Sequence, residues 1–304
     1  MDTLAETGGI AMGKVKDLAL FEKLKPFMDK VSVGSFRPSK LFSLCVKASV
    51  VKCFEFNLHA RQNTDDAFFS LPSLRGICED LIVLNYIKGM PKKHRERLIQ
   101  LLMNHDVASR IKSQDAFFKV ARPQQPVLRL KNLERRIGSL KKKICAIWNK
   151  HGWPNLQNKT MPPVSQIADK QGQEVLSKLY DYLYRLTSAG VHFNVQSLLR
   201  SGWGEKRRGK FSTRNFNTYF SAYTRIYGAY LFCVCFEFFG KFLRPPKEVS
   251  DTIAEIRKTV FLESRWPEMV TFEEMNIKVP QDNGILRIAL SFIQAEKSKG
   301  FVKK

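Results

Sequence analysis

The sequence predicts an all-α protein, built as an antiparallel multi-helix bundle. Two observations support this prediction: apolar residues recur at helical spacing along most of the chain, and the alternation typical of strands is scarce. Hydrophobic residues make up 44% and charged residues 26% of the 304 residues, which is ordinary for a soluble globular protein. A chain of this length can bury a large hydrophobic core.

Proline, glycine and serine mark the ends of the expected helices, because proline favours the first turn and glycine follows the last. The expected helices span residues 39–60, 72–88, 91–105, 169–200, 213–243, 247–263 and 284–298.

A further helix shows the clearest pattern, with apolar residues in a 4-3-4-3 spacing that makes a narrow seam. The seam consists of Leu133, Ile137, Leu140, Ile144 and Ile147, and basic side chains surround it. We expect the seam to pack and the opposite face to be strongly basic.

The chain is organised in three regions. A basic N-terminal helical region (1–152) is followed by a proline-containing loop (153–168) and a C-terminal helical region (169–304). Neither half carries a self-sufficient core, so we expect one integrated domain. The apolar run 226–236 is shorter than the roughly 20 residues that a membrane span needs, which predicts a buried core helix and no membrane association.

Six cysteines lack C-x-x-C spacing and mostly lie in apolar runs, as expected for reduced thiols in a cytoplasmic protein. No nucleotide-binding, nucleophile-elbow or zinc-protease motif occurs, and the five histidines show no ligand spacing. We therefore expect no cofactor and no dedicated metal site.

The charge is unusual. The chain has 51 lysines and arginines against 28 acidic residues, a formal net charge of +23. Such a surplus attracts polyanions, most commonly nucleic acid, although a basic chain can also serve solubility alone. The candidate nucleic-acid-binding residues are Arg135, Arg136, Lys141, Lys142, Lys143, Lys206, Arg207 and Arg208.

A polar stripe interrupts the longest helical run. Arg185, Ser188 and His192 are spaced i, i+3 and i+7, so a helix presents them on one face. Arginine can hold two phosphate oxygens, and histidine can transfer a proton near neutral pH. These are the catalytic groups that metal-free RNA cleavage needs. The alternative is a surface arginine beside a structural histidine.

Arg75 and Glu79 form an i,i+4 pair on a strongly apolar helix. Because burying charges is costly unless they pair or serve a site, we expect this pair to contact the 185–192 stripe from a neighbouring helix. A simple intrahelical ion pair is the alternative.

Arg185-x6-His192 resembles the R-x4–6-H motif of the HEPN superfamily, which contains helical nucleotide-binding and RNA-cleaving proteins of prokaryotic toxins and phage defence. Arg75-x-x-x-Glu79 with Ser188-x-x-x-His192 also resembles a family of bacterial all-α proteins. The resemblance covers about residues 40–200, with Leu186 where HEPN ribonucleases commonly have a polar residue. It implies a HEPN-like core with extra basic helices, and a homodimer with a composite active site.

The leading hypothesis is a metal-independent endoribonuclease of HEPN type, acting in phage defence or as a toxin, with an antitoxin or defence-system partner. His192 would be the acid and base and Arg185 would bind the scissile phosphate, supported by Ser188, Glu79 and Arg75. The alternatives are a non-catalytic basic module that binds nucleic acid or a partner protein, and a purely structural bundle.

Overall fold

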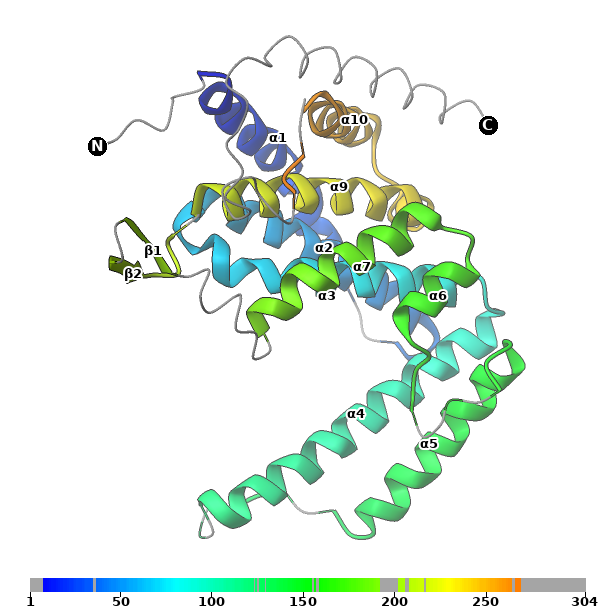
Figure 1. The fold of residues 1–304 in the computed structure, drawn as a ribbon. Helices are drawn as coiled ribbons and strands as arrows, with labels where there is room; N and C mark the ends of the chain where they lie inside the picture. The colour runs from blue at the N-terminus through cyan, green and yellow to red at the C-terminus, as the bar shows by residue number, and fades with distance from the viewer. Residues whose placement is uncertain are drawn as a thin grey trace.

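The protein is an all-α multi-helix bundle with one short β-hairpin, shown as a computed structural model in Figure 1. The structure describes residues 8–34, 37–122, 124, 126–128, 130–154, 156, 159–191, 202–205, 208–215, 217–263 and 266–268.

Long helices account for most of the described chain. They are α1 (Gly8–Ser32), α2 (Leu41–Gln62), α3 (Ala67–Lys88), α4 (Lys92–Ala121), α5 (Leu133–Lys150), α7 (Glu174–Val191), α9 (Asn217–Leu243) and α10 (Lys247–Leu262). Shorter elements are α6 (Val164–Lys170), the 3₁₀ turns η1 (Pro38–Lys40) and η2 (Thr64–Asp66), and the antiparallel strands β1 (Gly202–Glu205) and β2 (Arg208–Phe211).

Helix α9 is at the centre of the bundle. It packs against α2 and α3, and α10 covers it on another side (Figure 1). Its length and mean hydropathy of 1.5 would allow it to cross a membrane, and it is the one described helix that meets those criteria. Its side chains instead contribute Tyr223, Phe232 and Phe239 to the buried core.

Gly228 allows α9 to approach α2 closely at the point where the two helices cross. A side chain at Gly228 would place its Cβ 2.7 Å from the ring of Phe56, so only glycine fits at this crossing. The Asn57 amide donates a hydrogen bond of 3.0 Å to the Gly228 carbonyl across the same contact.

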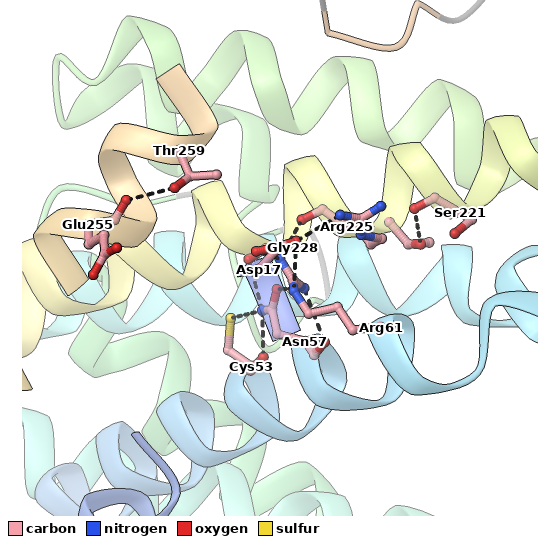
Figure 2. A network of polar contacts seen from close by, with 10 residues as sticks. Asp17, Cys53, Asn57, Arg61, Ser221, Arg225, Gly228, Glu255 and Thr259 are labelled. Atoms are coloured by element: carbon pink, nitrogen blue, oxygen red, sulfur yellow. Dashed lines mark hydrogen bonds and ion pairs between the residues drawn. The ribbon is translucent and has the colours of Figure 1, made fainter. Parts of the chain in front are cut away.

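An ion network fastens α1 to this core. Figure 2 shows Asp17 of α1, Asn57 and Arg61 of α2, and Arg225 of α9 converging where the three helices meet. Both Arg61 and Arg225 lie 3.0 Å from Oδ2 of Asp17, and the Arg61 side chain is 2% exposed. The Arg61 guanidinium also lies over the Phe21 ring, 4.1 Å from its centroid. The network therefore sets the position of α1.

Helices α4 and α5 form a hairpin that extends away from the bundle (Figure 1). At 1.5 Å per residue, the 30 residues of α4 span about 45 Å. The predicted seam of α5 joins the core in part: Ile144 is buried and Leu140 and Ile147 pack against the core residues, whereas Leu133 and Ile137 are half-buried. The hairpin presents its remaining faces to solvent.

Several boundaries differ from the sequence expectations. Helix α1 had not been expected, and α4 continues 16 residues beyond 105 to Ala121. Helix α3 begins at Ala67, so Pro72 lies inside it and not at its start. The last part of the expected proline-containing loop, residues 164–168, is helical and belongs to α6, which continues to Lys170; Gly172, with φ of 65°, separates α6 from α7. The short strands β1 and β2 had not been expected from the sequence. The helix expected over 284–298 lies outside the described residues.

Candidate functional site

The positive charge of the protein is concentrated in the α4–α5 hairpin. Residues 92–150 contain 16 lysines and arginines and four acidic residues, a formal net charge of +12 out of +23 for the whole chain. Each of the four acidic residues is already ion-paired within the hairpin, in the pairs Arg95–Glu96, Arg110–Asp106, Lys119–Asp115 and Lys112–Glu134. The other cations therefore have no compensating carboxylate on these two helices.

The predicted basic residues of α5 lie on that uncompensated surface. Arg135, Arg136, Lys142 and Lys143 are exposed, and Lys141 is half-buried. In the β-hairpin, Arg208 is the first residue of β2, and the structure does not describe its side chain. Lys206 and Arg207 lie outside the described residues.

Two cavities open along the hairpin, and both have cationic walls. One of about 420 Å³ is lined by His105, Ser109, Lys112, Ile137, Lys141, Lys159, Thr160 and Met161. The other, of about 300 Å³, lies where α4 begins and α5 ends, and is lined by Lys93, His94, Arg97, Ala146, Ile147 and Lys150. Neither lining contains a carboxylate, and the surface of the second cavity is mostly apolar.

The second cavity adjoins a pair of histidines that the sequence did not connect. Nδ1 of His94 and Nε2 of His151 are 2.9 Å apart, a hydrogen bond between the start of α4 and the residue after α5. Burial, and then the charge of His94, lower the pKa of His151. The residues are 57 positions apart, and no local spacing predicts their contact. Only the pairing of α4 with α5 brings them together.

The expected Arg75–Glu79 pair exists, and it does contact the helix that carries the stripe. Nε of Arg75 donates to Oε1 of Glu79 at 2.8 Å. The hydroxyl of Tyr180, on α7, donates to the same oxygen at 3.2 Å, and the Arg75 guanidinium lies 4.2 Å from the ring centroid of Tyr184. The pair is thus more than an intrahelical ion pair, since it joins α3 to α7. Two tyrosines make this contact, and the sequence analysis had assigned a role to neither of them.

Burial raises the pKa of Tyr180 to about 12, and the negative charge of Glu79 acts in the same direction. The phenol is therefore protonated at neutral pH and acts as a hydrogen-bond donor to Glu79.

The stripe itself is described only in part. Arg185 is exposed on α7, directly after Tyr184. Ser188 is also in α7, but its side chain is outside the described residues, as is His192 altogether. The expected meeting of Arg185 with His192 in one cleft therefore stays a prediction. Within the described parts of the chain, no three metal-ligating side chains gather.

Comparison with known proteins identifies a family for this chain. The model of a protein family described as a family of unknown function (DUF5677) matches residues 40–210. That range contains the α4–α5 hairpin, the His94–His151 pair and the α3–α7 contact, whereas Asp17 and Arg225 lie outside it. No curated protein and no solved structure matches the chain.

Proposed function

We propose that this protein, which belongs to the DUF5677 family, binds RNA through its α4–α5 hairpin. The observation that carries the proposal is the net charge of +12 on residues 92–150, where every acidic residue is already paired. Binding phosphates at such a surface releases counterions, which is the main source of affinity in sequence-independent nucleic-acid binding.

Exposed aromatic and apolar groups near the far end of the hairpin favour a single strand. Phe117 is 63% exposed and lies between the ion-paired Asp115 and Lys119 on α4. An exposed ring among cations can stack on an unpaired base while the cations hold the backbone. A duplex offers no free base face, so we expect single-stranded RNA to bind more tightly.

Neutralising three hairpin lysines tests the proposal. In the variant Lys141→Gln/Lys142→Gln/Lys143→Gln, we expect the affinity for a single-stranded RNA oligonucleotide at 0.1 M salt to fall by about a hundredfold, and the slope of log affinity against log salt to flatten by about 2. Fluorescence anisotropy over a salt series measures both quantities.

The matched control removes the same charge elsewhere. Lys23, Lys25 and Lys30 are exposed on α1, and their replacement by glutamine should leave the salt slope unchanged. Equal weakening by both triple variants would mean that the overall charge, and not the hairpin, attracts RNA.

A second candidate function is metal-independent RNA cleavage of HEPN type. What favours it is the docking of Arg75 and Glu79 against Tyr180 and Tyr184, which fixes the face of α7 from which the exposed Arg185 extends. In this function His192 transfers protons and Arg185 binds the scissile phosphate, while Ser188 orients either the phosphate or the imidazole of His192. Phage defence, a toxin role, a homodimer and an antitoxin partner belong to the same proposal.

Cleavage is tested with total RNA in the presence of a chelator. We expect the wild-type protein to shorten RNA and His192→Ala to lose at least a hundredfold in rate, since general acid–base groups contribute about that much or more. His59→Ala, at an exposed position of α2 outside the hairpin, serves as the matched control and should retain cleavage. Equal rates for wild type and His192→Ala would exclude this assignment.

A further inference from the structure

We propose that the cavity between the start of α4 and the end of α5 is a nucleotide-phosphate-binding site, in which His94, hydrogen-bonded to His151, holds the phosphate together with Lys93, Arg97 and Lys150. This site is distinct from the Arg185–His192 stripe and does not depend on RNA binding by the rest of the hairpin. A free nucleotide and a nucleotide at the end of an RNA strand share the chemistry that it recognises.

The size and lining of the cavity fit such a ligand. Its volume of about 300 Å³ is at the lower end of the range for small-molecule sites. The surface of the cavity is mostly apolar, and its lining combines Ala146 and Ile147 of α5 with the solvent-exposed cationic residues Lys93, Arg97 and Lys150. An apolar wall suits a base or ribose, and the cations suit a phosphate dianion.

The histidine pair adds a donor whose protonation responds to the ligand. The 2.9 Å bond uses Nδ1 of His94 and Nε2 of His151, which leaves Nε2 of His94 for a ligand. Two adjacent imidazolium rings repel each other, so the pair holds one extra proton more readily than two. A phosphate dianion at His94 stabilises that proton, and binding is therefore accompanied by proton uptake.

The rest of the fold holds the pair in place. His151 is followed by Gly152, which has φ of 82° and ends α5 in the left-handed conformation that glycine allows. The Tyr86 hydroxyl of α3 donates to the His151 carbonyl at 2.8 Å and accepts from Nε1 of Trp153 at 2.8 Å. The site is thus anchored to the bundle and does not move freely with the hairpin.

Binding is tested with adenosine 5′-monophosphate, with adenosine, and with one RNA oligonucleotide carrying either a 5′-phosphate or a 5′-hydroxyl. We expect the monophosphate to bind and adenosine to bind at least tenfold more weakly. A tighter complex with the 5′-phosphorylated RNA than with the 5′-hydroxyl RNA identifies strand ends as the source of the ligand, and equal affinity identifies the free nucleotide.

The variant Lys93→Gln/Arg97→Gln should weaken binding of the monophosphate at least tenfold. The matched control, Lys142→Gln/Lys143→Gln, removes the same charge from exposed positions of α5 and should leave it unchanged. Equal loss in both variants, or no binding of the monophosphate by the wild-type protein, overturns the proposal. If the control variant lost affinity for RNA and still bound the monophosphate, the nucleotide site and the RNA-binding surface of the hairpin would be two different sites.

Proton uptake is tested with inorganic sulfate, whose charge does not change between pH 5.5 and 8. We expect sulfate to bind at least threefold more tightly at pH 5.5, and His94→Gln to remove this difference. The other titratable groups around the pair are Lys93 and Arg97 on α4, Lys150 on α5, Tyr86 on α3 and Lys170 on α6.

Nuclear magnetic resonance of the histidine rings locates the ligand, because the chain has five histidines. Sulfate should shift the ring signals of His94 and His151 and leave that of His59 in place, each assigned from its glutamine variant. If sulfate shifted the ring signals of other histidines and not those of His94 and His151, the proposal would be overturned. This experiment uses the wild-type protein with sulfate and is independent of whether the charge variants fold.

Discussion

Replacing Asp17 with asparagine should lower the free energy of unfolding by about 3–5 kcal/mol, the range for breaking a buried ion pair from one side. Asp17 accepts from two arginines, and its loss leaves their charges next to each other in the core. The Arg61 side chain is 2% exposed, so its guanidinium depends on hydrogen-bond acceptors within the protein. Its remaining acceptors are the carbonyl and amide oxygens of Asn57, at 3.1 and 2.8 Å, and the carbonyl of Arg225 at 3.3 Å.

Urea unfolding monitored by circular dichroism measures this loss. The matched control is Asp29→Asn, at an exposed position of the same helix, which should change stability by less than about 0.5 kcal/mol. Adding Arg61→Met to Asp17→Asn should recover part of the loss, because it removes one of the two unpaired charges. A double variant as unstable as the sum of the single variants would show that the ion pair is not the cause.

Replacing Trp148 with alanine should cost about 3–5 kcal/mol, the range for truncating a fully buried large aromatic side chain. Trp148 is 0% exposed and lies where α5 meets the bundle. Its ring centroid is 5.9 Å from that of Tyr86 on α3, and its Nε1 donates to the Thr160 carbonyl at 3.0 Å. The side chain therefore fastens the base of the hairpin to the core.

Trp148→Phe is the informative control, because it keeps a buried aromatic ring while it removes the N–H donor and part of the indole. We expect it to cost about 1–3 kcal/mol, the penalty of leaving the Thr160 carbonyl without its partner. Both variants are measured by urea unfolding. A phenylalanine variant as unstable as the alanine variant would indicate that the hydrogen bond, and not packing, dominates.

The sequence predicted the helical class and the character of α5 because both depend on local periodicity. Five apolar residues from Leu133 to Ile147 define the seam of α5, and the structure places that seam against α4 and the core. Helix α1 was not predicted, because its residues had not been assigned any helical spacing. The burial of Asp17 in α1 is explained only by Arg61 and Arg225, which come from two other helices. The predicted start of α3 was wrong, because Pro72 was taken as the first residue of the helix, whereas the helix begins at Ala67.

The candidate sites divide in the same way. The Arg75–Glu79 pair was predictable, because i,i+4 spacing on a helix is a local property. Its contacts with Tyr180 and Tyr184 required α7 to pack on α3, and a tyrosine within an apolar run gives no sign of such a role. The meeting of Arg185 with His192 stays a prediction that the proposed RNA cleavage assay addresses.

By itself the sequence determined that the chain is helical, that it is strongly basic, and that α5 carries one packing face and one cationic face. These properties follow from composition and from the 3.6-residue period of the helix, which act over a few residues. Only the tertiary structure decided that over half of the net charge lies on one projecting hairpin, and that His94 meets His151 beside a cationic cavity. Contacts between residues far apart in sequence arise when helices pack, and side-chain packing in three dimensions sets them.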